Sequence, residues 1–193
     1  GRGSLGFSVC YARRMSAPWN NWYHCNGNTY GTWLRGDSRG WRSRHHREHC
    51  EGDYKNPPAH GTFDELHSRS RELLKREPVR LSPAARKVAC AVFAESLHER
   101  GIDVVAVAID DHHFHVLARF PDRSPRRWIG LAKAKSARAL SDAKLMPQGG
   151  VWAVRCKVTP INDRAHQVQA ARYIQRHARR GAAVVTWKQL KRD

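Results

Sequence analysis

Two histidines near the middle of the chain have the spacing that metal-assisted chemistry needs. His113 and His115 stand in the stretch HFHVLARF, residues 113–120, whose alternation predicts a β-strand. Strand side chains alternate between faces, so both imidazoles point the same way, and their Cβ atoms are expected about 7 Å apart. Imidazole nitrogens bind divalent ions, and the pair could converge on one. Two surface histidines in a chain with 12 would give the same pattern, so a further ligand must come from another element.

A predicted helix later in the chain supplies a tyrosine and a third imidazole. Tyr173 and His177 are four residues apart and so share one helical face, in a stripe extended by His166 and Ala170. A tyrosine beside a metal ligand can serve as a nucleophile, whereas a tyrosine at the edge of the core is the alternative. If this helix packs beside the histidine strand, three imidazoles would hold a cation that polarises a phosphodiester.

The elements that must position these residues alternate between strands and helices. The strand 113–120 turns Phe114, Val116, Ala118 and Phe120 toward the core and pairs in a hairpin with the apolar run Asp103–Ile109. Ser-Pro pairs at 82–83 and 124–125 predict the starts of two helices, which end near Gly101 and Leu140. Strands are predicted at Val151–Val158 and at 182–186. Between them lies the tyrosine helix, capped by Asn162 or Asp163 and ended by Gly181, with an apolar stripe of Val168, Ala171, Ile174 and Ala178.

Together with a strand region at Trp19–Leu34, these elements predict an α+β fold. Their order gives a ferredoxin-like βαββαβ core with an antiparallel sheet and extra elements. The length suits a single domain, predicted at 19–187 and followed by a basic tail at 188–193. Residues 1–18 are predicted to be a disordered or non-native arm, with Met15 as a possible natural start. Arg35–Pro58 lacks apolar periodicity and is predicted to be a long loop insertion.

The net charge of +18 implies a polyanionic partner, most simply nucleic acid. No run of about 18 apolar residues is present, which argues against a membrane partner. Five scattered cysteines without a CxxC pair do not resemble a disulfide framework or a zinc ribbon. No signal peptide is legible, so the expected location is the cytoplasm.

Basic residues cluster in two predicted segments that we expect to contact the backbone of a nucleic acid. Lys133 and Lys135 are about 200° apart around a helix, so they cannot both face one ligand. Trp128 could stack on a base, although core packing is the commoner role for such a residue. The histidine-rich stretch Arg42–Cys50 fits no standard zinc spacing and is predicted to be a DNA-contacting loop. The expected DNA-binding residues are Arg35 and Arg39 in the long loop and Arg123, Arg126, Arg127, Lys133, Lys135 and Arg138 on and just before the helix that follows Ser124.

Four segments, taken in order, resemble the HUH single-tyrosine transposases, in particular their REP-associated and insertion-sequence-like members. They are GTWLRGDSRGW (31–41), HFHVL (113–117), WAVRCKVTPINDRAHQ (152–167) and YIQRHARRGA (173–182). The resemblance extends from about Trp22 to Trp187 and implies the HUH endonuclease fold.

The resemblance also implies an activity and roles for single residues. His113 and His115 would hold Mg²⁺ or Mn²⁺ at the scissile phosphate, and His177 stands where the family often completes the metal site. Tyr173 would attack single-stranded or hairpin DNA, forming a 5′-phosphotyrosine link and releasing a 3′-hydroxyl. Such enzymes work as monomers or homodimers and need no external energy source, in agreement with the absence of a GxxxxGK[ST] motif from the sequence.

The chain departs from the family pattern at two places. Asp110-Asp111-His112 stands where relatives often have Pro-Asn, so Asp111 either orients an imidazole or, as we favour, forms the hairpin turn. The segment Tyr23–Gly27 is more polar than a central strand should be, which would fit a degenerate copy. The alternatives to an enzyme are therefore a catalytically inactive, domesticated DNA-binding protein and an RNA-binding protein on the same fold.

Overall fold

The computed structural model describes residues 19–41, 59–146 and 150–186. Within these ranges the chain forms five strands and four α-helices, the last continued by a short 3₁₀ turn, so the α+β class is confirmed. No helix of this part of the chain is long and apolar enough to cross a membrane. In chain order the elements are β1 (Trp22–Asn28), α1 (Asp64–Glu72), α2 (Pro83–His98), β2 (Asp103–Ile109), β3 (His113–Arg119), α3 (Pro125–Asp142), β4 (Lys157–Pro160), α4 (Arg164–Arg176), η1 (His177–Arg180) and β5 (Ala183–Thr186).

The strands form one antiparallel sheet in the order β4-β1-β3-β2-β5. The elements β1, α2, β2, β3, α3 and β4 follow each other along the chain as a βαββαβ unit. The strand order of this unit, β4-β1-β3-β2, is that of a ferredoxin-like fold, so the sheet is compatible with that fold, and β5 is added at the β2 edge. The histidine strand β3 lies at the centre, between β1 and β2. Its position is therefore fixed by hydrogen bonds on both edges.

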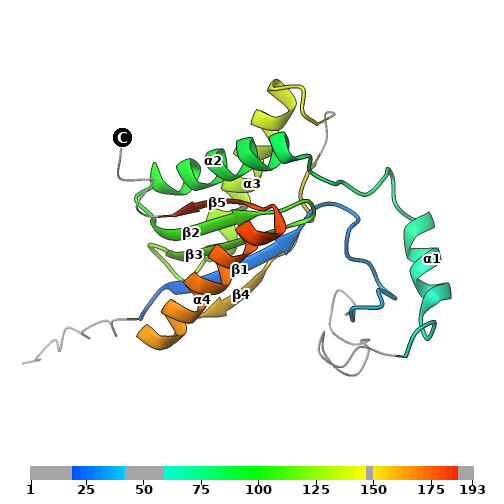
Figure 1. The fold of residues 1–193 in the computed structure, drawn as a ribbon, viewed down its shortest axis with the longest axis horizontal. Helices are drawn as coiled ribbons and strands as arrows, with labels where there is room; N and C mark the ends of the chain where they lie inside the picture. Colours follow the sequence, from blue (N-terminus) through cyan, green and yellow to red (C-terminus); the bar gives the residue numbers. More distant parts are fainter. Residues whose placement is uncertain (1–18, 42–58, 147–149, 187–193) are drawn as a thin grey trace, which may run out of the picture.

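Helices cover both faces of this sheet (Figure 1). α2 and α3 pack on one face over the main core, which includes Phe93, Phe114, Val116 and Ile129. α4 crosses the other face, where a second, smaller apolar cluster joins Leu117 to helix residues. The face of β3 that carries His113 and His115 is therefore largely covered, and His115 is only 5% exposed.

Two elements differ from the sequence-based prediction. The strand predicted at Val151–Val158 is wrong over Val151–Cys156, since β4 begins at Lys157 and Trp152 forms only an isolated bridge with Thr29. The indole of Trp152 instead packs in the core and donates its N–H to Ser136 Oγ. Helix α1 was not predicted, because none of its residues is buried and it has no apolar stripe to detect.

Helix α4 begins and ends as predicted but buries a different stripe. The Asp163 side chain accepts from the His166 backbone N–H at its start, and η1 ends at Gly181, whose φ of 82° suits glycine. The predicted stripe is wrong at Ala178, which is exposed, while Val168 and Ala171 lie at the flank. The buried stripe is Gln167, Ala170, Ile174 and His177, so the helix turns an imidazole toward the sheet.

The segment that follows β1 forms a lobe with α1 beyond one end of the sheet (Figure 1). Gly36, with φ +83°, lies so close to α1 that a Cβ atom would stand 2.4 Å from the backbone nitrogen of His67. Asp37 accepts from the backbone N–H and the guanidinium of Arg39, and Arg39 also stacks on Trp33. The motif GTWLRGDSRGW therefore builds the lobe.

Several predictions fall outside the described residues. These are the arm at 1–18, the histidine-rich stretch Arg42–Cys50 with most of the predicted loop, and the basic tail at 188–193.

The two Ser-Pro helix starts provide a matched pair for stability measurements. Ser82 Oγ accepts from the Ala85 backbone N–H, whereas the Ser124 side chain makes no capping bond. Replacing Ser82 by Ala should therefore lower the free energy of unfolding by about 1 kcal/mol, and Ser124→Ala should change it much less. Urea denaturation of both variants measures the difference, and equal losses would contradict the capping assignment.

Candidate metal centre

Three imidazoles meet where β3 begins and α4 ends. The ring centroids of His113 and His115 are 4.8 Å apart, and His177 lies 5.1 and 4.6 Å from them. One ligand atom from each residue can be chosen so that all three lie within 4.8 Å of one another. The third candidate ligand, which the sequence pattern required, therefore comes from the end of the helix that carries Tyr173.

Local structure explains why these three side chains converge. His113 and His115 share a face because β3 is extended and paired on both sides. His177 is the first residue of η1, where the helix tightens directly after α4, and its ring is buried against the strand. The centre is therefore held by a central strand and a helix end.

Asp110 orients the first of the ligands. Its Oδ2 lies 2.9 Å from His113 Nδ1, and its Oδ1 accepts the backbone N–H groups of His112 and His113 at 3.0 and 2.9 Å. Burial would raise the pKa of Asp110, but these hydrogen bonds outweigh it, so the pKa lies well below its usual value. An ionised carboxylate only accepts, so His113 Nδ1 carries the proton and Nε2 is free for a cation.

The neighbouring acid has a different role. Asp111 Oδ1 lies 2.6 Å from His112 Nδ1, and the Arg80 guanidinium donates to its Oδ2. Asp111 thus belongs to the hairpin turn, as favoured from the sequence, and its partner imidazole is outside the three-histidine cluster. The orienting carboxylate is Asp110, one residue earlier.

Two ring nitrogens in the cluster have no hydrogen-bond partner among the described residues. They are His115 Nε2 and His177 Nδ1, and both atoms are buried. Burying such a nitrogen without a partner costs free energy. A cation bound by the lone pair of the nitrogen would compensate for this cost. Burial, followed by the neighbouring His113, lowers the pKa of His115 to about 2 and also lowers that of His177, so both rings are neutral and able to bind.

A second possible group, made of Asp110, His112 and His113, overlaps with the first. The oxygens of Asp110 are already engaged by the two backbone N–H groups and by His113. Neither His112 nor His113 has a buried nitrogen without a partner among the described residues. His113, His115 and His177 are therefore the better candidate for a metal centre.

Tyr173 stands next to these ligands in the same chain. Its ring centroid lies 5.3 Å from that of His115 and 5.0 Å from that of His177, with both pairs edge-to-face. Its side chain is 47% exposed, in contrast to the buried imidazoles behind it. The residue expected to be a nucleophile is thus open to solvent at the edge of the cluster.

His24 is a fourth imidazole of the site, and the sequence analysis did not identify it. It projects from β1 toward α4, with Nε2 3.0 Å from His115 Nδ1 and its ring 6.1 Å from that of Tyr173. Burial, followed by the charges of His166 and Lys157, lowers the pKa of His24 to about 4. The only signal for it was the unusual polarity of Tyr23–Gly27.

The residues expected to contact DNA lie on and just before α3 or in the lobe, and none of them lies on α4. Helix α3 packs with α2, on the face opposite α4 and the histidines. Lys133 is 8% exposed and donates to backbone carbonyls, including that of Ala153 at 2.8 Å, while Lys135 pairs with Glu95 and Glu99. Trp128 donates to Asp122 and packs against the core. Arg123, Arg126, Arg127 and Arg138 are exposed.

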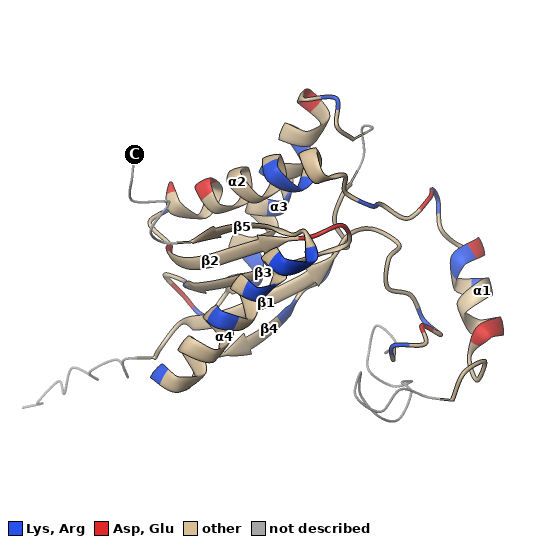
Figure 2. Cartoon of the chain, in the orientation of Figure 1, with Lys and Arg blue, Asp and Glu red and all other residues tan. Residues whose placement is uncertain are grey.

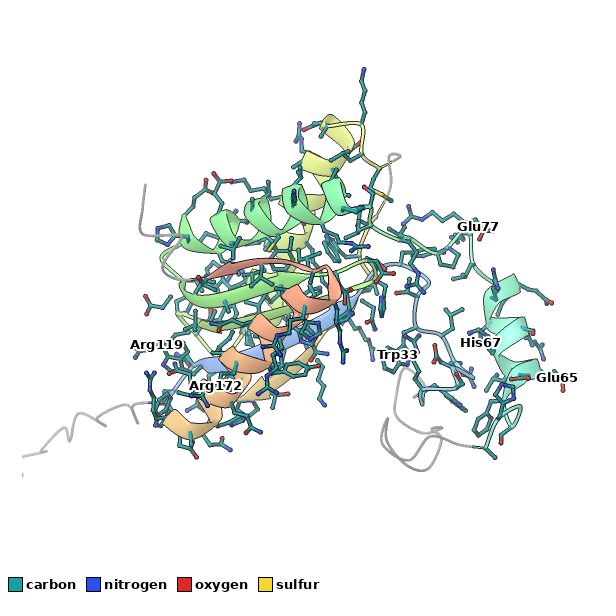
Figure 3. All side chains as sticks on the ribbon, in the orientation of Figure 1. Trp33, Glu65, His67, Glu77, Arg119 and Arg172 are labelled. Carbon is teal, nitrogen blue, oxygen red and sulfur yellow. The ribbon has the colours of Figure 1, made fainter. Side chains whose placement is uncertain are left out.

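The two arginines of the lobe are engaged with its own residues. Arg39 binds Asp37 and the carbonyl of Thr32, and Arg35 lies over the ring of Trp41. In Figure 3 the lobe residues Trp33 and His67 lie to the right of Arg119 and Arg172, which lie on the side of the molecule away from the lobe. The arginines closest to Tyr173 along the chain belong to another element.

That element is α4 with η1. Figure 2 shows bands of basic residues along this helix, with no acidic residue among them. All of these arginines are exposed, and Arg172 and Arg176 flank Tyr173. Lys157 on β4 lies close enough to His24 to affect its pKa. The arginines of this segment are Arg164, Arg172, Arg176, Arg179 and Arg180.

Comparisons with known proteins do not show which family the chain belongs to. No protein-family model matches the chain, and no curated protein matches it.

The different roles of Asp110 and Asp111 lead to a test of the metal centre. Asp110→Asn keeps one oxygen for the backbone N–H groups but loses the carboxylate that fixes His113, so Mn²⁺ affinity should fall about 10- to 100-fold. Asp111→Asn, in the same turn, should leave the affinity within a few-fold. Isothermal titration calorimetry with Mn²⁺ measures both, and an unaffected Asp110→Asn variant would rule out the orienting role.

Proposed function

We propose that this protein is a metal-dependent endonuclease and strand transferase for single-stranded DNA, with the HUH fold and a single-tyrosine transposase mechanism. The observation that carries the proposal is the exposed ring of Tyr173 beside the cluster of His113, His115 and His177. The strongly basic helix that carries Tyr173 supports the choice of a polyanionic substrate. The ordered sequence motifs favour DNA over RNA.

The donor set favours a particular class of cation. The three imidazoles offer nitrogen ligands, whereas Mg²⁺ prefers oxygen and Mn²⁺ accepts both. Mn²⁺ is therefore the better fit, and Mg²⁺ is the alternative when water and phosphate oxygens complete the shell. His113, His115 and His177 would hold the cation, which would supply polarisation of a phosphodiester and stabilisation of the charge that develops on its oxygens.

Tyr173 then has the role of nucleophile, and its oxygen replaces the 3′ oxygen on the phosphorus without any further reactant. Its phenolic oxygen bonds to the phosphorus, the bond from phosphorus to the 3′ oxygen breaks, and the strand is left with a free 3′-hydroxyl. The phenol gives its proton to solvent, and the 3′ oxygen gains one. The covalent 5′-phosphotyrosine keeps the energy of the phosphodiester, so a 3′-hydroxyl of another strand can reverse the step.

The arginines of α4 have the role of binding the DNA backbone on either side of the scissile phosphate. Arg176 follows Tyr173 by three residues, so it shares the same helical face, and Arg172 lies one turn before Arg176. Guanidinium groups bind phosphate through bidentate hydrogen bonds. The exposed arginines of α3 are on the far face and are less suited to hold the strand that Tyr173 attacks.

The nucleophile assignment can be tested by trapping the covalent product. With Mn²⁺ and a radiolabelled single-stranded hairpin oligonucleotide, the wild type should form an adduct that survives denaturing electrophoresis. Tyr173→Phe should abolish this adduct, because only the phenolic oxygen is lost. Tyr30→Phe, which removes a phenol that accepts from the Lys75 backbone N–H, should retain it. Hairpin binding without cleavage in any divalent ion would instead indicate a DNA-binding protein.

The face that binds DNA can be identified from salt dependence. Replacing Arg172 and Arg176 together by Ala should weaken binding of single-stranded DNA and reduce the slope of log K against log salt by about 1.4, from about 0.7 per phosphate contact. The matched pair Arg127→Ala and Arg138→Ala, on α3, should leave the slope nearly unchanged. Fluorescence anisotropy with a metal-free Tyr173→Phe background measures the slopes without cleavage. The opposite result would place the strand on α3.

A further inference from the structure

His24 makes the polar stretch of β1 part of the metal centre. In the antiparallel pairing of β1 with β3, His24 is opposite Leu117 and Asn26 is opposite His115, so His24 lies diagonally across from His115 on the face covered by α4. The two rings are tilted, with centroids 5.2 Å apart, and His24 Nε2 is 3.0 Å from His115 Nδ1. The β1–β3 register thus brings a second imidazole to one metal ligand.

One proton must lie between these two nitrogens for a hydrogen bond to form. If His115 Nδ1 carries it, then His115 Nε2 is bare and can bind a cation. If His24 Nε2 carries it, the neutral His115 ring must hold its own proton on Nε2, at the position that a cation needs. The direction of this hydrogen bond therefore decides whether His115 is a ligand.

The surroundings of His115 favour the first arrangement. His115 Nε2 is buried and has no hydrogen-bond partner among the described residues. A proton on that atom would be a buried donor without an acceptor, which is costly, while a bare nitrogen awaits a cation. In the first arrangement His24 is a neutral ring with its proton on Nδ1.

We propose that His24 is a positioning residue that accepts the Nδ1 proton of His115 and thereby holds the His115 ring in the tautomer that binds the divalent cation. This inference rests on the proposed metal centre. His113 and His115 then have different supports, because the Asp110 carboxylate orients the first and the His24 imidazole orients the second. The polarity of β1 at this point is a requirement of the site.

The proposal can be tested with three substitutions that separate acceptance from packing. His24→Gln places a carboxamide oxygen near the former Nε2 and should keep Mn²⁺ affinity within about threefold. His24→Phe keeps the ring volume without an acceptor, and His24→Ala removes both, so each should weaken binding about 10- to 100-fold. His166→Gln, on α4 near His24, serves as the control and should bind as the wild type does.

Isothermal titration calorimetry gives the affinities, and circular dichroism confirms that each variant is folded. Full Mn²⁺ affinity in His24→Phe would overturn the proposal, because a ring without an acceptor would then suffice. A loss in His24→Gln equal to that in His24→Phe would also overturn it.

The tautomers can be measured directly, without enzymatic activity. Long-range ¹H–¹⁵N NMR of the metal-free protein at pH 7.5 should show His115 protonated on Nδ1 and His24 protonated on Nδ1, and Zn²⁺, which is diamagnetic, should not change this pattern. Finding His24 protonated on Nε2 would overturn the proposal. If the protein binds no divalent cation at all, the proposed metal centre fails, while the spectrum still reports which ring donates.

Discussion

The site depends on the cost of burying imidazole nitrogens that lack partners. Under α4 the rings of His115 and His177 are almost completely shielded from water, yet each leaves one nitrogen without a hydrogen-bond partner among the described residues. Such atoms cost free energy unless something compensates for them, and a cation shared by the three rings would do so. The same burial lowers the pKa of both groups and so keeps their lone pairs available near neutral pH.

Meeting this requirement determines how the rest of the structure is arranged. β3 is paired on both edges, so it holds His113 and His115 at one fixed spacing. The turn before it must supply an acceptor for His113, and Asp110 does so while its other oxygen closes the hairpin through two backbone N–H groups. Asp110 therefore fixes both the turn and the His113 ring. A proline at this position of the turn would have no carboxylate for His113.

The sequence predicted those parts of the fold whose signals are local. The cap at Ser82, the helix stop at Gly181 and the alternation of His113–Phe120 each depend on neighbouring residues, and the ligand trio followed once one helix was placed beside one strand. The His24–His115 bond depends on the register between residues 91 positions apart, which periodicity does not contain. Likewise, the burial of Lys133 depends on how the chain at Ala153 turns back toward α3. Lys133 was predicted to bind DNA, but its ammonium group donates a hydrogen bond to the backbone carbonyl of Ala153.

The exposure of the four site residues indicates the side from which a substrate must approach. Tyr173 is 47% exposed and the His113 side chain 21%, whereas His115 and His177 are 5% exposed. In the proposed mechanism, a phosphate arriving from solvent would therefore meet Tyr173 and His113 first, and the more deeply buried His115 and His177 would lie behind the cation. Because α4 carries both Tyr173 and the flanking arginines, the proposed backbone binding and attack would occur on the same helix. A shift of α4 along the sheet would displace His177 and Tyr173 together, so in the proposed mechanism metal binding and the geometry of attack are coupled.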